Sequence, residues 1–61
     1  MITKTLHPGD RVTDKIGHRY DILEVRAGGY VLYVQALTPR HDGVYVPIGQ
    51  PFVMGRSDLR A

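Results

Sequence analysis

Apolar and polar residues alternate in short runs along this chain, and turn-forming residues separate the runs. The longest apolar run covers 30–37, and a second β-rich run covers 20–26. Two such runs on either side of a glycine pair indicate a β-hairpin. Because Gly28 and Gly29 adopt positive φ angles at little cost, the pattern predicts a tight type I′ or II′ turn between them.

Shorter runs before this hairpin extend the β pattern. Residues 1–8 predict either a short leading strand or a loose arm, since apolar and polar residues alternate from Met1 to Leu6. Pro8 and Gly9 predict a turn, after which a strand runs from about Gly9 to Asp14. The polar connection that follows contains one apolar residue, Ile16, which we expect to cover one end of the domain.

Three further elements follow the hairpin. The turn at 38–43 predicts a second hairpin, which leads into a strand at 44–48 with Pro47 at a sheet edge. Residues 52–54 predict a short closing strand. Residues 55–59 predict a turn and one helical turn, with Ser57 as the cap and Leu59 packed against the core.

The two strands of the central hairpin differ in how clearly they define a buried face. In 20–26, Leu23 and Val25 share one side, and we expect them in the core with Tyr20 and Ile22 outside. The alternative is a β-bulge that reverses the alternation part-way along the strand. In 30–37 both faces are largely apolar, which is typical of a strand covered on both sides and predicts a partner on the second face.

Length and composition restrict what can stabilise such a fold. Sixty-one residues make a single domain, 1–61. Domains this small often need disulfides, a metal or oligomerisation. The chain has no cysteine and its three histidines are isolated in sequence, so we expect no metal and consider a homo-oligomer beside a well-packed monomer. No apolar run approaches the ~20 residues of a membrane span, and we expect a cytoplasmic protein without membrane contact.

The order of these elements resembles that of the SH3-like small barrels, including KOW-type modules. The resemblance covers 9–59 and includes the phrase Gly9-Asp10-Arg11-Val12, which is common in such barrels. It implies an all-β, SH3-like five-stranded small barrel with one short 3-10 turn near the C-terminus. This fold hosts many unrelated functions, so the resemblance does not by itself indicate an activity.

A narrower resemblance is to the plasmid-borne type II dihydrofolate reductases, which are SH3-like barrels that assemble as tetramers around a central pore. They share the Gly-Asp-Arg-Val start. Their pore strand has a Val-Gln-Ile-Tyr-Pro phrase, whereas the corresponding segment here is Gly43-Val44-Tyr45-Val46-Pro47. The ligand-holding glutamine of that family is absent from this segment. The resemblance implies an oligomeric pore-type reductase as an alternative function.

The residues themselves give no catalytic signal. Ser57, the only serine, is interpreted as a helix cap, and Glu24, the only glutamate, as a solvated charge beside Arg26. Asp10 and Asp14 share a strand face but lack the dense oxygen spacing of a calcium site, so they too are interpreted as solvated charges. We therefore expect no catalytic residue, no cofactor and no enzyme activity.

A binding role has more candidate residues. Aromatic and aliphatic side chains that face outward would form a partner-binding patch, for which the candidates are Tyr20, Ile22, Val31, Tyr33 and Tyr45. Basic residues could surround that patch and contact nucleic acid, and here the candidates are Arg11, Lys15, Arg19, Arg26, Arg40 and His41. Three interpretations of the tyrosines remain open: they cap the core, form a protein interface, or stack on bases.

The sequence thus predicts a small non-catalytic binding or regulatory module that docks on a macromolecular partner. That partner is a protein of the nucleic-acid machinery or nucleic acid itself, and the module itself is a candidate homo-oligomer. A structural or assembly protein of a phage or mobile element is a further alternative. A net charge of +2 favours neither partner class strongly.

Overall fold

Five antiparallel strands and two single 3-10 turns make up the computed structural model, which describes residues 5–60. The strands are β1 (Arg11–Thr13), β2 (Arg19–Arg26), β3 (Val31–Pro39), β4 (Tyr45–Pro47) and β5 (Phe52–Gly55). The 3-10 turns are η1 (Ala27–Gly29) and η2 (Arg56–Asp58). The predicted all-β class is confirmed, and so is the short turn near the C-terminus.

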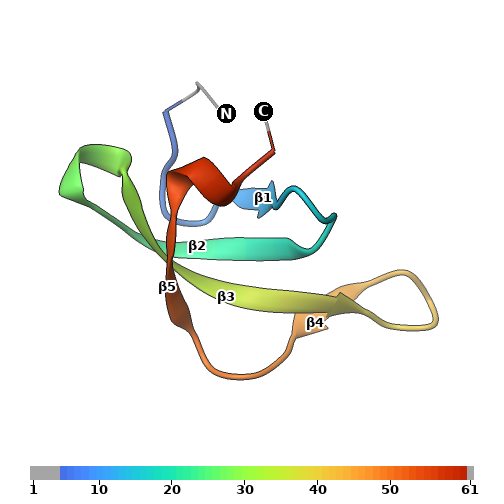
Figure 1. Cartoon of the computed structure of the whole chain (residues 1–61). Helices are drawn as coiled ribbons and strands as arrows, with labels where there is room; N and C mark the ends of the chain where they lie inside the picture. Colours follow the sequence, from blue (N-terminus) through green and yellow to red (C-terminus); the bar gives the residue numbers. More distant parts are fainter. Residues whose placement is uncertain (1–4, 61) are drawn as a thin grey trace.

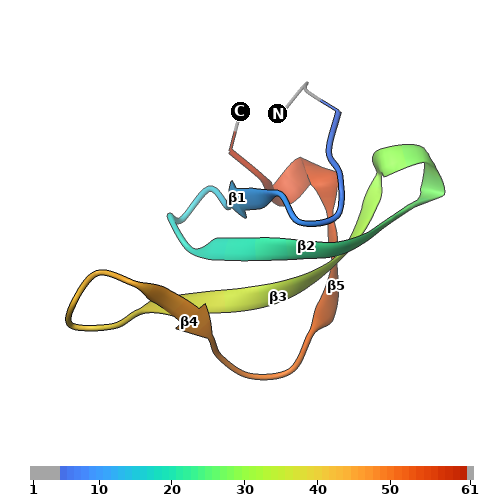
Figure 2. The ribbon, with the colours of Figure 1, turned by 180° about the vertical axis from the view of Figure 1, so that it is seen from behind.

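The hairpin of β2 and β3 is the centre of the sheet. The strand order is β1-β2-β3-β4, and β5 also pairs with β3. Along one edge β3 pairs with β2, and along the other it pairs first with β5 and then with β4. Figures 1 and 2 show β5 near the start of β3 and β4 near its end, from opposite sides. Pro47 lies in β4, an edge strand, as predicted.

The connection between β2 and β3 is longer than the predicted two-residue turn. Arg26 pairs with Val31, so four residues lie between the strands, and three of them form η1. Both glycines have positive φ angles, as predicted, but so does Ala27, with φ of 52°. The prediction of a tight type I′ or II′ turn is wrong because the chain closes this hairpin with a wider left-handed loop.

A β-bulge sets which side chains of β2 enter the core. The register with β3 shifts between Ile22 and Glu24, which leaves Leu23 as the extra residue. Tyr20 and Ile22 are buried, whereas Leu23 is 45% exposed. The first expectation for this strand, with Leu23 inside and Ile22 outside, is therefore wrong. The alternative of a bulge that reverses the alternation is confirmed, and it lets Val25 pack against the core.

The core lies on one face of the β2–β3 hairpin. Its buried members come from the segment before β1, from β1, β2 and β3, and from the residue after η2, and are Leu6, Val12, Tyr20, Ile22, Leu32, Val34 and Leu59. The ring of Tyr20 meets Phe52 edge-on, with centroids 5.9 Å apart and planes at 81°. Packing of Leu59 against the core is confirmed, and its backbone forms an isolated antiparallel bridge with Asp14.

The bridge brings the end of β1 close to the segment after η2. The amide of Arg60 donates to the carbonyl of Thr13 at 2.8 Å, and the amide of Lys15 donates to that of Asp58 at 3.3 Å. Closure of the whole sheet into a barrel stays a prediction. The leading strand or arm predicted for 1–8 lies partly outside the described residues, and 5–8 contain no strand.

Two predictions for single residues outside the strands are wrong. Ile16 does not cover an end of the domain, since it is 82% exposed. Ser57 does not cap a helix, because η2 begins after Gly55 and has no side-chain cap hydrogen bond. The turn is instead tied to the sheet by the amide of Arg56, which donates to the carbonyl of Tyr30 at 3.0 Å.

Candidate functional site: a tyrosine–arginine face

The face of the sheet opposite the core contains an unusual set of side chains. Residues that lie directly opposite each other in antiparallel strands share a face. Glu24 lies opposite Tyr33, and Arg26 lies opposite Val31. We call this surface the tyrosine–arginine face and define it by Arg11, Arg19, Arg26, Val31, Tyr33, Tyr45 and Val53.

One half of this face is centred on Tyr33 in β3. The guanidinium carbon of Arg26 lies 5.3 Å from the ring centroid of Tyr33, within the range of a cation–π contact. The same guanidinium donates to Glu24 Oε2 at 2.9 Å, and this hydrogen bond lowers the pKa of Glu24. Val53 of β5 lies opposite Tyr33 and is 54% exposed. This half therefore presents an aromatic ring, an aliphatic side chain and a neutralised ion pair to solvent.

The other half is centred on Tyr45 in β4. The guanidinium carbons of Arg19 and Arg11 lie 4.7 and 5.9 Å from the ring centroid of Tyr45. Arg11 also donates to Asp21 Oδ1 at 3.0 Å. Leu37, which lies opposite Arg19, is buried although it does not belong to the core cluster. Its burial shows that part of this face is covered from within the chain.

The residues predicted to bind a partner divide between the two faces. Tyr20 and Ile22 are buried in the core, so the expectation that they face outward is wrong; the bulge after Ile22 is the physical reason. Val31, Tyr33 and Tyr45 lie on the tyrosine–arginine face and are half-buried. Val53 belongs with them but was not predicted, because the pairing of β5 with β3 is not visible in the sequence.

The predicted basic residues are divided in a similar way. Arg11, Arg19 and Arg26 share the tyrosine–arginine face. Lys15 lies in the exposed β1–β2 loop, and 40–41 lie in the loop between β3 and β4, beyond the end of β3. These six residues therefore do not form one continuous basic surface.

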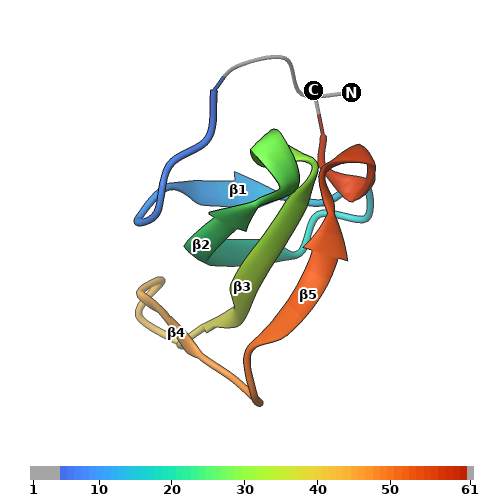
Figure 3. The same cartoon turned by 90° about the vertical axis from the view of Figure 1, so that its left-hand side faces the viewer.

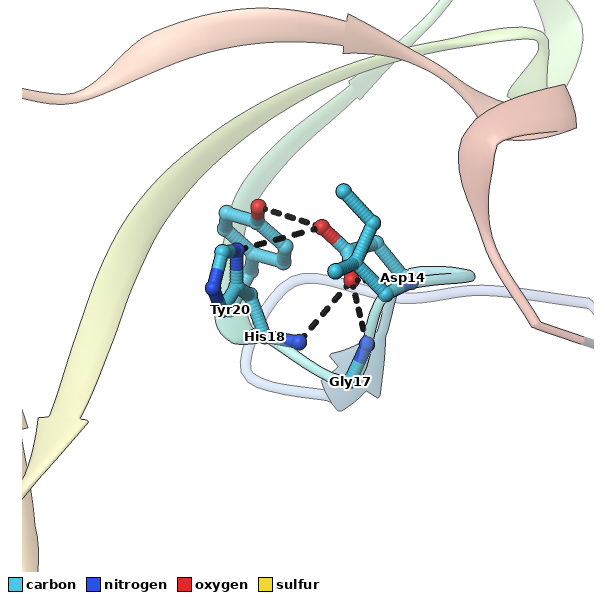
Figure 4. Close-up of polar contacts among 5 residues, drawn as sticks. Asp14, Gly17, His18 and Tyr20 are labelled. Carbon is cyan, nitrogen blue, oxygen red and sulfur yellow. Dashed lines mark hydrogen bonds and ion pairs between the residues drawn. The ribbon is translucent and has the colours of Figure 1, made fainter.

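A second polar cluster surrounds Asp14, at the end of β1 (Figure 4). Its Oδ1 accepts hydrogen bonds from the amides of Ile16, Gly17 and His18 at 3.0, 2.8 and 2.9 Å. Its Oδ2 accepts one from the hydroxyl of Tyr20 at 2.8 Å and lies 3.7 Å from Nδ1 of His18. The interpretation of Asp14 as a solvated charge is wrong, because only 7% of the residue is exposed.

Two opposing effects act on this carboxylate. Burial raises the pKa of Asp14, but the hydrogen bonds from Tyr20 and from three backbone amides outweigh it and hold the pKa below its usual value. Burial, together with the hydrogen bond to Asp14, raises the pKa of Tyr20. Both groups thus stay in the protonation states that suit their shared hydrogen bond. The arrangement fixes the β1–β2 loop and is structural.

A turn signal in the sequence could have located this cluster. Aspartate at the first position of a type I turn and glycine at the fourth are favoured, and Asp14 and Gly17 have that spacing. The amide of Gly17 donates to the carbonyl of Asp14 at 3.2 Å, the hydrogen bond that often closes such a turn. The burial of Asp14 had no such signal, since it depends on the bridge to Leu59.

Gln35 has a comparable positioning role at the other end of the sheet. Its side-chain amide donates to the carbonyls of Ala36, Ile48 and Gly49 at 3.1, 3.0 and 3.2 Å. These bonds hold the segment between β4 and β5 against β3.

Across residues 5–60, no three His, Asp or Glu side chains are grouped as a metal site would need, and no helix is long and apolar enough to cross a membrane.

Comparison of the chain with protein-family models, with curated proteins and with solved structures finds no match.

Proposed function

We propose that this chain is a small non-catalytic binding module that docks on a protein through its tyrosine–arginine face. The proposal rests chiefly on the two tyrosine rings, each in contact with a guanidinium group, on a sheet face turned away from the core. Tyrosine and arginine are enriched among the residues that dominate binding at protein interfaces. Val53 adds an exposed aliphatic side chain next to Tyr33.

The charge of this face favours a protein partner over nucleic acid. Arg11 forms an ion pair with Asp21, and Arg26 forms one with Glu24. Two carboxylates therefore neutralise two of the three arginines on this face. Binding to a phosphate backbone depends on cations that can replace its counterions. A surface whose own arginines are mostly neutralised fits a partner with both signs of charge.

A second copy of the chain is the protein that fits best. The neighbouring Arg26 and Glu24 would meet the same pair in reversed order across a two-fold axis, so the face is complementary to itself in charge. The core within residues 5–60 consists of few side chains, and small domains gain stability from burial between copies. We therefore propose a homo-oligomer in which Tyr33 lies near the axis.

The mass of the protein in solution tests this proposal. By sedimentation velocity at high micromolar concentration, we expect at least twice the 6.9 kDa of one chain. Tyr33→Glu places a charge at the proposed axis, and we expect it to reduce the mass to that of one chain. Tyr30→Glu is the matched control, because Tyr30 is 75% exposed and lies outside the face, so this variant should keep the wild-type mass.

Circular dichroism establishes that both variants are folded before their masses are compared. A wild-type mass of one chain at the highest soluble concentration would overturn the proposed oligomer. So would an equal loss of mass in both variants, since that result would not depend on the face. Binding of a folate or a nicotinamide cofactor would overturn the non-catalytic assignment and favour the reductase alternative.

One observation favours single-stranded nucleic acid as a second candidate partner. Within residues 5–60, Arg19 contacts the ring of Tyr45 but no carboxylate, so its charge is available to a phosphate. If single-stranded nucleic acid is the partner, the logarithm of the affinity for a labelled oligonucleotide falls linearly with the logarithm of the salt concentration. Arg19→Gln then reduces that slope by about one. Affinity that does not change with salt would exclude this candidate.

A further inference from the structure

Met54 in β5 carries the only sulfur atom within residues 5–60. The sequence has no cysteine, and its other methionine, Met1, lies outside the described residues. Oxidants convert the apolar thioether of methionine into a polar sulfoxide, and dedicated reductases reverse this change. The surroundings of Met54 therefore decide what an oxidant does to this fold.

Met54 lies on the core side of β5. It is paired with Leu32 of β3, which has no exposed surface, and it packs against the hydrophobic core. Its neighbour Val53 belongs to the tyrosine–arginine face, because successive side chains of a strand point to opposite sides of the sheet. An oxygen atom added to Met54 would thus place a polar group against apolar side chains, away from that face.

A small cavity connects Met54 to solvent. Its volume is about 250 Å³, and it is lined by Asp14, Lys15, Ile16, Met54 and Asp58. Drug-sized ligands occupy sites of about 300–1,000 Å³, whereas one water molecule takes only about 30 Å³. The cavity is therefore small for an organic ligand but has ample room for a molecule the size of hydrogen peroxide.

This cavity lies where the β1–β2 loop meets the end of the chain. Figure 3 shows the end of β5, the red turn η2 and the cyan β1–β2 loop on the same side of the molecule. The amide of Lys15 donates to the carbonyl of Asp58 at 3.3 Å, and the amide of Arg60 donates to that of Thr13 at 2.8 Å. We call these two hydrogen bonds the β1–η2 seam, and Met54 lies beside it.

We propose that Met54 is a site of reversible oxidation by hydrogen peroxide, and that the sulfoxide loosens the β1–η2 seam and destabilises the domain. The sulfur attacks one peroxide oxygen, so an S–O bond forms as the O–O bond breaks. The proton of the transferred oxygen passes to the departing hydroxide, which leaves as water. The sulfur loses two electrons and the peroxide gains them.

A methionine sulfoxide reductase reverses the step with a dithiol as the reductant. The sulfoxide oxygen leaves as water, and the dithiol supplies the two electrons and two protons as it becomes a disulfide. This inference is independent of the partner proposed for the tyrosine–arginine face.

The rate of oxidation tests whether the cavity gives access to the folded domain. Wild type is treated with hydrogen peroxide at several urea concentrations below the unfolding transition, and mass mapping of peptides follows the sulfoxide at Met54. We expect the rate to stay constant across these concentrations, because the folded domain itself reacts. A rate that rises steeply with urea from the start would mean that Met54 reacts only after unfolding, and would overturn the proposal.

Unfolding in urea measures the effect of the added oxygen atom. Oxidation of wild type should lower the ratio of folded to unfolded protein about 5–30-fold, as expected for one polar group placed against a core. Met54→Leu keeps an apolar side chain of similar volume, so it should fold and lose nothing after the same treatment. Met1 is still present in this variant, which controls for its oxidation. Unchanged unfolding of wild type after full oxidation of Met54 would overturn the proposal, as would an equal loss in Met54→Leu.

A second variant tests the same effect without an oxidant. Glutamine is polar and similar in length to methionine, so Met54→Gln should unfold at a lower urea concentration than Met54→Leu. Peroxide should then change neither variant further. Equal unfolding midpoints for the two variants would contradict the claim that a polar group at this position destabilises the domain.

Hydrogen exchange locates the part of the domain that oxidation loosens. We expect the amides of Lys15 and Arg60 to exchange faster in the oxidised protein. The amide of Arg40, which donates to the carbonyl of Val44 at 2.7 Å in the β3–β4 loop, should keep its rate. Treatment with methionine sulfoxide reductase and dithiothreitol should restore the mass and the original exchange rates. Equal acceleration at Arg40 would overturn the role of the seam, and exchange that stays fast after reduction would overturn reversibility.

Discussion

Replacement of Asp14 by alanine should destabilise the domain far more than the loss of one short side chain suggests. The carboxylate accepts four hydrogen bonds, three from amides of the β1–β2 loop and one from the buried hydroxyl of Tyr20. In Asp14→Ala, that hydroxyl loses its partner, which costs about 1–3 kcal/mol. The three amides belong to exposed loop residues and regain water, so they add less than their number implies. We expect a total loss of about 3 kcal/mol.

This loss is large against the stability of the whole domain. At about 0.05–0.15 kcal/mol per residue, a chain of this length has roughly 3–9 kcal/mol in total. Urea unfolding followed by circular dichroism measures the difference directly. The matched control is Asp42→Ala, because Asp42 also accepts from a backbone amide and pairs with an arginine, but its side chain is 44% exposed. We expect that variant to lose less than about 1 kcal/mol.

A double-mutant cycle isolates the contact between the two side chains. Tyr20→Phe removes only the hydroxyl that donates to Asp14 at 2.8 Å and leaves the ring in the core. The coupling free energy between Asp14→Ala and Tyr20→Phe should be about 1–2 kcal/mol. If Asp14→Ala and Asp42→Ala lower the free energy of unfolding equally, the assignment of Asp14 as the anchor of this loop is refuted.

Two further predictions concern the same core and can be measured by the same unfolding assay. Because the folded state lowers the pKa of Asp14, its stabilisation is present above the unfolded pKa of about 3.9 and is lost as pH falls through the folded value. The stability difference between wild type and Asp14→Asn should therefore shrink below about pH 4, and a constant difference down to pH 2 would contradict this. Leu59→Ala should lower the free energy of unfolding by about 2–5 kcal/mol, because Leu59 is fully buried. Leu23→Ala changes the exposed residue of the bulge and should lower it by less than about 1 kcal/mol. Similar losses in the two variants would refute the placement of both residues.

The sequence predicted the elements of this fold better than the direction of its side chains. The strands at 52–54 and around Pro47, the central hairpin and the final 3-10 turn were all visible as local patterns. The side chains of β2 were not, because alternation reverses at a bulge and nothing in 20–26 marks its position. Strict alternation counted back from Val25 places Leu23 in the core and Ile22 outside. The bulge shifts the alternation by one residue, so Ile22 lies inside and Leu23 outside.

The candidate sites depend on contacts that are distant in sequence, and this limited their prediction. Tyr33 and Val31 are correctly placed on the second face of β3, because alternation along 30–37 puts them together on one largely apolar face. The stacking of Arg19 on Tyr45 requires β2 and β4 to lie near each other across β3, which local patterns do not specify.

The structure also changes what the apolar second face of β3 implies. A face of this kind predicts a covering partner, but part of it is already covered from within the chain. Leu37 is buried outside the core cluster, beside Arg19, whose guanidinium lies over Tyr45. Near Tyr33 the cover is thinner, because Val53 opposite it remains more than half exposed. A partner of the kind proposed above would therefore gain most by contacting the β5 side of the face, where Tyr33 and Val53 lie opposite each other.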